Sequence, residues 1–87
     1  FLNSVTARTL AEVGGLSSHE GEEFLFIVKG TLLLFSQAYA PLRLEKNESV
    51  YFDAAQPHAY VNGGQHKAEF LVITSAGMPE MEKEAPQ

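Results

Sequence analysis

The sequence predicts an all-β protein, either a barrel or a sandwich of two sheets. Its apolar segments are short and rich in Val, Ile, Phe, Leu and Tyr. Glycine, proline and other turn residues separate these segments at intervals of about 8 to 12 positions. No stretch combines sustained helical periodicity with helix caps. Many short strands joined by such turns are typical of a sandwich or a barrel.

The alternation of apolar runs and turn residues sets the expected strands. Gly30 separates two strongly apolar runs, which predicts a tight hairpin with a positive φ at this glycine. The segment 78–87 is polar and contains two prolines, so it cannot continue a sheet. We therefore expect one domain over residues 1–77 and a polar tail over 78–87. The expected strands lie at about residues 4–12, 23–29, 31–36, 42–44, 49–53, 58–62 and 68–75.

Composition limits the classes of function. A chain of 87 residues, 45% hydrophobic and 20% charged, is one globular domain. Its net charge of −5 repels phosphate backbones, so this segment by itself is not expected to bind nucleic acid. The absence of cysteine excludes disulfides, a thiolate nucleophile and a cysteine-based zinc site, and it suits a reducing cytoplasm.

The ends and the apolar runs of the chain bear on its cellular context. The longest apolar runs, at 24–28 and 32–35, are too short to cross a bilayer, so we expect no membrane partner. No signal-peptide pattern opens the chain. It begins with Phe1 and not with Met, which suggests a domain cut from a longer protein.

Two expected strands are apolar on both faces. In 23–29, Leu25 and Ile27 share one face, while Phe24, Phe26 and Val28 share the other. The segment 31–36 shows the same pattern. Because an isolated small barrel needs only one apolar face, the surplus predicts a homodimer in which a second copy covers it.

Three side chains stand out as possible metal ligands: His19, Glu23 and His58. In an unbroken strand, four residues span about 13 Å, too far for His19 and Glu23 to reach one ion. A bend at Glu20-Gly21 would fold His19 back beside Glu23. Taken singly, each residue has an ordinary explanation, as a solvated loop histidine, an acidic turn or a strand cap.

The stretch from His19 to Gly30 resembles the first motif of the cupin family, with the form His-x-His, three or four residues, Glu, six residues, Gly. His19 stands at the second His, Glu23 at the Glu and Gly30 at the closing Gly. The first His falls on Ser17, which is a poor ligand for a transition metal. The segment 47–62 is similar to the second motif, Gly-x5-Pro-x-Gly-x2-His-x3-Asn.

In this second segment His58 and Asn62 match the last two motif positions, whereas Asn47, Asp53 and Ala55 replace Gly, Pro and Gly. The resemblance covers about residues 16–76. It implies a cupin-type double-stranded β-helix, or jelly-roll barrel, whose four-ligand metal site is reduced to three residues. Two imidazoles and one carboxylate with open positions are typical of non-haem Fe(II) sites, and Mn, Ni, Co or Zn would also fit.

Strand parity supplies candidates for a ligand pocket. If His58 points inward, so do Tyr60 and Asn62, and an inward Glu23 implies that Leu25 and Ile27 line the interior. Of Tyr51 and Phe52, one should face inward. The alternative for the aromatic side chains is that they only fill the core.

The amino-acid sequences of the two motifs are similar to those of C-terminal cupin domains in helix-turn-helix transcriptional regulators. They read HEGEEFLFIVKGTL and YFDAAQPHAYVN. This resemblance implies a cytoplasmic sensor domain of a bacterial regulator, which binds a small molecule and reaches DNA only through a domain absent from these residues. The alternative is a small metal-dependent enzyme of the dioxygenase, epoxidase or isomerase type. A third, weaker interpretation is a purely structural dimerisation module. No further obvious acid, base or nucleophile is present, which favours the sensor, and we assign no catalytic residue.

Overall fold

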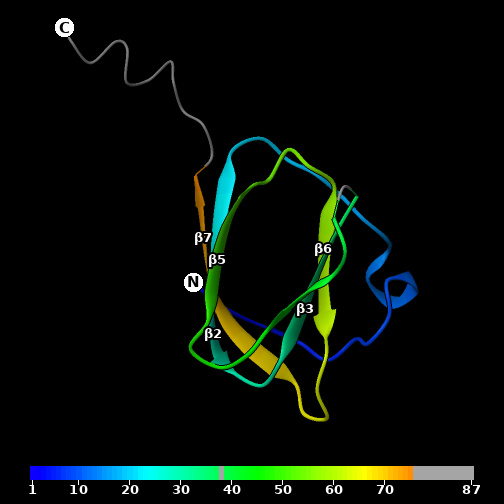
Figure 1. Cartoon of the computed structure of the whole chain (residues 1–87), viewed down its shortest axis with the longest axis vertical. Coiled ribbons are helices and arrows are strands. Elements are labelled where there is room, and N and C mark those ends of the chain that lie inside the picture. Colours follow the sequence, from blue (N-terminus) through cyan, green and yellow to red (C-terminus); the bar gives the residue numbers. More distant parts are fainter. Residues whose placement is uncertain (38, 76–87) are drawn as a thin grey trace, which may run out of the picture.

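Two antiparallel sheets face each other across the molecule (Figure 1). The computed structural model describes residues 1–37 and 39–75. The first sheet has the order β1-β7-β2-β5, with β1 at Leu2–Val5, β7 at Ala68–Ser75, β2 at Glu22–Lys29 and β5 at Ser49–Asp53. The second has the order β4-β3-β6, with β4 at Leu42–Leu44, β3 at Leu32–Ser36 and β6 at His58–Asn62. The all-β prediction is confirmed.

The core lies between the two sheets. Along β2 the buried side chains alternate with partly buried or exposed ones, so Glu23, Leu25 and Ile27 share the inward face. Leu25 and Ile27 are fully buried, and Phe70 of β7 and Leu32 of β3 pack in the same cluster. The polar end of this inward row, at Glu23, therefore lies next to a closed apolar core.

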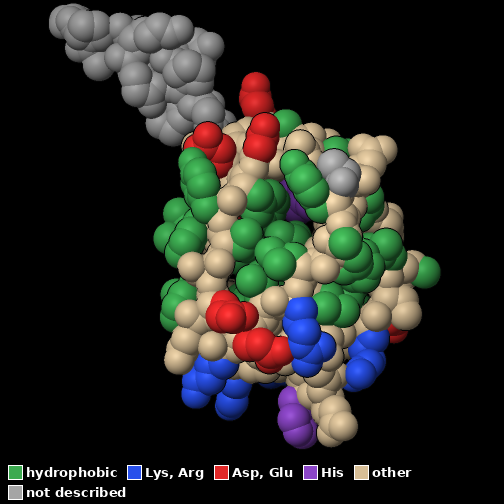
Figure 2. All heavy atoms as spheres, viewed as in Figure 1, with side chains coloured by type: hydrophobic (Ala, Val, Ile, Leu, Met, Phe, Trp, Pro, Cys, Tyr) green, Lys and Arg blue, Asp and Glu red, His purple; other side chains and the backbone are tan. Residues whose placement is uncertain are grey.

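The outward face of the first sheet is also apolar. Phe24 pairs in register with Ile73 of β7 and Tyr51 of β5, and Phe26 pairs with Leu71. Ile73 and Tyr51 are 61% and 64% exposed. Figure 2 shows hydrophobic side chains along this side of the molecule. The sequence prediction of a strand that is apolar on both faces is thus confirmed for β2.

Gly30 forms the predicted tight connection between β2 and β3. Its φ is 82°, in the left-handed region that favours glycine. A Cβ at this position would meet the carbonyl oxygen of Lys67 at 3.0 Å and the Cα of Ala68 at 3.1 Å. The hairpin can therefore pack directly against the start of β7.

The expected strand at 4–12 is wrong in its bounds. The strand β1 covers Leu2–Val5, and a short 3-10 turn, η1, covers Ala11–Val13. This turn is held by a reciprocal pair: the Thr9 backbone N–H donates to the Glu12 carboxylate, and the Glu12 backbone N–H donates to the Thr9 hydroxyl. Such a pair is the capping-box arrangement, which competes with a strand.

The expected tail at 78–87, and the end of the expected domain at residue 77, lie outside the described residues. Within the described part of the chain, no helix is long and apolar enough to cross a membrane.

Candidate metal centre

A bend brings His19 back toward β2. Gly21 has a φ of 103°, which lets the chain reverse direction just before β2 begins. The His19 backbone N–H donates to the carbonyl of Ala54 at 3.0 Å, and the Ala54 N–H donates to the carbonyl of Gly21 at 2.9 Å. The turn between β5 and β6 therefore holds the bend in place, as the spacing of His19 and Glu23 required.

Three potential ligand atoms converge at this bend. His19 Nε2 lies 3.2 Å from Glu23 Oε2, and His58 Nε2 lies 3.7 Å from Glu23 Oε1. One ligand atom from each of the three residues lies within 4.8 Å of the others. Glu23 and His58 are 3% and 5% exposed, whereas the His19 side chain is 43% exposed. The cluster is therefore closed on the side of the core and open on the side of His19.

Backbone carbonyls orient both imidazoles. His58 Nδ1 lies 2.7 Å from the carbonyl oxygen of Gln56, and His19 Nδ1 lies 3.2 Å from that of Glu20. A carbonyl accepts a hydrogen bond, so each neutral ring carries its proton on Nδ1 and presents the Nε2 lone pair to the cluster. Metal-binding histidines are commonly oriented in this way.

The Glu23 carboxylate is held by two hydroxyls. Tyr60 donates to Oε1 at 2.5 Å, and Thr74 donates to Oε2 at 3.5 Å. Burial raises the pKa of the Tyr60 hydroxyl, and the hydrogen bond to Glu23 and its negative charge raise it further. Tyr60 therefore stays protonated and keeps its donor role at any ordinary pH.

Aromatic packing fixes the ring of His58. Phe52 meets it edge-to-face with ring centroids 4.9 Å apart, and His19 also meets it edge-to-face with ring centroids 5.4 Å apart. Of the pair Tyr51 and Phe52, Phe52 is therefore the inward-facing residue. Sequence reasoning left Tyr51 and Phe52 as alternatives and did not assign Thr74 to the site. The pairing of Glu23 with Phe52 and with Thr74 identifies both residues once the register is known.

These residues fit a divalent transition metal by their donor chemistry. Two imidazole nitrogens and one carboxylate oxygen suit Fe, Mn, Co, Ni or Zn and leave open coordination positions. His19, Glu23 and His58 would hold the ion, and Tyr60 and Thr74 would orient the carboxylate. Ser17, at the position of the missing histidine, pairs through its backbone with His58, with N–O distances of 3.0 and 2.8 Å.

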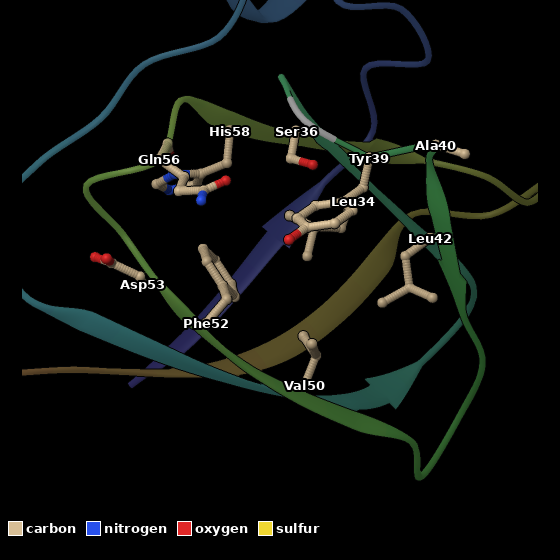
Figure 3. A pocket seen from close by; sticks show the side chains of 10 residues that line it. All are labelled: Leu34, Ser36, Tyr39, Ala40, Leu42, Val50, Phe52, Asp53, Gln56 and His58. Atoms are coloured by element: carbon tan, nitrogen blue, oxygen red, sulfur yellow. The ribbon is translucent and has the colours of Figure 1, made fainter.

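Two cavities adjoin the cluster. The first has a volume of about 500 Å³ and lies between β5 of one sheet and β3 and β4 of the other. His58 forms part of its wall (Figure 3). Figure 2 shows a hollow on this face, rimmed by hydrophobic side chains, with a histidine visible inside it. The second has a volume of about 320 Å³ and is lined in part by His19, His58, Tyr60 and Ser17.

The four residues expected to line a pocket do not all lie at a cavity. Tyr60 lines the second cavity and contacts Glu23. Leu25 and Ile27 face inward but belong to the closed core, with no exposed surface, and line neither of these two cavities. Asn62 is buried, and its side-chain oxygen accepts a hydrogen bond from the Gly64 N–H at 2.8 Å, which is a turn contact.

A two-sheet β fold with two histidines and one glutamate gathered at one end defines a small β-barrel domain built around an interior site. The chain matches the cupin domain over residues 9–74, most of its length, and it therefore belongs to the cupin family. The predicted cupin-type barrel is thereby confirmed. No curated protein matches the chain.

Several solved structures share the fold. Fe(II) HppE in complex with substrate superposes with a TM-score of 0.73 at 21% identity, over 85% of this chain and 43% of that one. Hydroxypropylphosphonic acid epoxidase from S. wedmorenis gives a TM-score of 0.71 at 18% identity, over 85% and 41%. A protein from Thermus thermophilus gives 0.67 at 19% identity, over 86% and 69%. The chain thus spans less than half the length of the epoxidase.

Proposed function

We propose that this domain binds a divalent transition metal through His19, Glu23 and His58 and accepts a small organic ligand in the adjoining cavity. The observation that carries the proposal is the convergence of the three ligand atoms within 4.8 Å. The orientation of both imidazoles by carbonyl oxygens supports it, because it leaves both Nε2 atoms free to bind an ion.

The first candidate role is that of a sensor. In this proposal the domain belongs to a bacterial transcriptional regulator in the cytoplasm, and a ligand in the barrel biases a helix-turn-helix domain elsewhere in that protein. The similarity of the two motif sequences to those of regulator cupin domains supports this role, and so does a cavity of a size suited to small molecules. A ligand acts as a signal only if it binds two states of the regulator with different affinity.

The second candidate role is that of a metal-dependent enzyme, and the open side of the cluster at His19 favours it. A bound metal would supply Lewis-acid or oxygen-binding chemistry at its free positions. The chain's own residues would hold the carboxylate, keep the rings in the binding tautomer and exclude water on the side of the core. The structural likeness to an epoxidase that contains Fe(II) is consistent with this role.

Metal titration of the chelator-stripped domain tests the proposal. Calorimetry with Fe(II), Mn(II), Ni(II) and Zn(II) should give one site per chain. His58→Ala should weaken binding by about 100-fold or more, because loss of an outer partner alone commonly costs about 10–100-fold. His66→Ala is the matched control, because His66 is exposed and lies outside the cluster. Equal losses from the two substitutions, or no binding of any metal, would remove the metal site.

A second measurement separates the two roles. The Fe(II)-loaded domain is supplied with oxygen and hydroxypropylphosphonic acid, and oxygen uptake is recorded. The sensor role predicts no uptake above that of the Fe(II)-loaded domain without the phosphonate. Uptake that depends on the phosphonate and on His58 would establish the enzyme.

A further inference from the structure

The cavity beside His58 has apolar walls contributed by both sheets. Val50 and Phe52 come from β5, Leu34 comes from β3 and Leu42 comes from β4 (Figure 3). Leu42 is 44% exposed and Tyr39, at the rim, is 72% exposed. These two large side chains carry apolar surface that a bound molecule would remove from water.

The polar groups of this cavity are mostly uncharged. They are the Ser36 hydroxyl, the Tyr39 hydroxyl and the Gln56 amide, in addition to the ring of His58. In Figure 3 the Tyr39 ring lies over the cavity and the Gln56 amide lies beside His58. Such groups can donate to or accept from a neutral ligand without a charge on either side.

No lysine or arginine is among the described residues that line either cavity. The one charged residue of the first cavity's described lining is Asp53, and Figure 3 shows its carboxylate directed away from the other side chains. That carboxylate accepts a hydrogen bond from the Ala55 N–H at 3.0 Å. In the metal-free domain, an anion entering this cavity would lose its hydration without gaining a positive partner from the described walls.

We propose that, in the metal-free domain, this cavity selects an uncharged, mainly apolar molecule with a hydrogen-bonding group, and discriminates against anions of the same shape. The inference rests on the proposed function, because it concerns the ligand of that same site. A volume of about 500 Å³ lies within the range of small-molecule pockets and leaves ample room for a body the size of one substituted six-membered ring.

Two probes with the same hydrocarbon body test the proposal: cyclohexylmethanol and cyclohexanecarboxylate. Each is titrated into the metal-free domain and followed by amide NMR shifts. We expect the alcohol to bind at least about tenfold more tightly than the carboxylate, because only the carboxylate loses the hydration of a charge. The largest shifts should lie along β5 and at Gln56. Leu42→Trp, which fills the mouth, should abolish binding of the alcohol, and thermal melting should show that this variant remains folded.

A charge-reversal variant makes the test specific to the cavity. Gln56→Lys introduces a cation beside His58 and should make the carboxylate the tighter ligand. Gln65→Lys adds the same charge in the exposed turn before β7 and should leave the preference for the alcohol unchanged.

Three results would overturn the proposal: no binding of either probe, a wild-type preference for the carboxylate, or full binding to Leu42→Trp. Because these titrations use metal-free protein, their failure is independent of the metal titration that tests the proposed function.

Discussion

The carboxylate of Glu23 is the group on which the site depends. It is buried, faces both imidazoles and accepts hydrogen bonds from Tyr60 and Thr74. A buried carboxylate without such partners would carry a large desolvation cost. The hydroxyls therefore allow an acidic side chain to stand at the end of an apolar row.

Tyr60→Phe should weaken the site without changing its shape. The substitution removes one donor to Glu23 and should lower metal affinity by about 10–100-fold. It should also lower the free energy of unfolding by about 1–3 kcal/mol, because the carboxylate loses a hydrogen bond in a buried position. Calorimetry and urea unfolding measure the two effects.

Tyr51→Phe is the matched control for this substitution. The Tyr51 hydroxyl donates to Glu22, the neighbour of Glu23 on the opposite, exposed face. Its loss should leave metal affinity unchanged. If both variants bound metal as tightly as the wild type, Tyr60 would have no part in positioning the carboxylate.

At the scale of single residues, the sequence predicted the three candidate ligands but not the hydrogen bonds that hold the Glu23 carboxylate. The motif spacing singled out His19, Glu23 and His58, and the structure brings them together. The hydroxyl of Thr74 could not be assigned, because the pairing of β2 with β7 joins residues 51 positions apart. A register of this kind follows from the fold and not from local sequence.

At the scale of the secondary-structure elements, the bend at Gly21 places His19 beside Glu23 at the start of β2. Gly21→Ala places a Cβ at a φ of 103°, which costs about 1–2 kcal/mol of stability and displaces His19. We therefore expect both a lower unfolding midpoint and weaker metal binding. Gly14→Ala is the control: its φ is 85°, and a Cβ there would meet no atom within 4 Å. It should cost similar stability with unchanged metal affinity, and parallel losses of affinity would contradict the role of the bend.

The turn η1 carries a pH-dependent contact. Hydrogen bonds from the Arg8 and Thr9 backbones and from the Thr9 hydroxyl lower the pKa of Glu12 below its ordinary value of about 4.5. A depressed pKa means that the contact stabilises the turn above the ordinary value and is lost as pH falls through the folded pKa. An NMR titration of the Glu12 carboxyl should show this, and Thr9→Ala should move its pKa back toward 4.5. An unchanged pKa in that variant would contradict the reciprocal pair.

The sequence predicted the later strands well, and the Thr9–Glu12 pair explains why it failed near the N-terminus. The bounds expected for 42–44, 49–53, 58–62 and 68–75 agree with β4 to β7. The expectation for 4–12 was wrong because apolar content alone does not reveal a side chain that bonds its own backbone nearby. Thr9 and Glu12 have capping-box spacing, which was the available signal.

For the whole molecule, the outward face of the first sheet remains to be explained. Phe24, Phe26, Leu71 and Ile73 form paired apolar rows on it. We propose that a second copy covers this face, because self-association lets the same apolar patch cover its equivalent on the partner. About 800 Å² per partner is enough for a stable dimer.

Sedimentation at micromolar concentration tests this assembly. The wild type should sediment at twice the mass of the 9.5 kDa chain. Ile73→Glu should give a monomer, because it places a charge within the apolar rows. Val13→Glu is the control, since Val13 is partly exposed on η1 and away from this face. A monomeric wild type would contradict the proposal.

The most direct test of the metal site is anomalous diffraction from crystals of the zinc-loaded domain, recorded at the zinc absorption edge. We predict one strong peak per chain, located between the Nε2 atoms of His19 and His58 and the Glu23 carboxylate. Distances to the nitrogens and to the carboxylate oxygen should be about 2.0–2.2 Å. A peak at His66 only, or no peak in crystals soaked with excess zinc, would contradict the assignment.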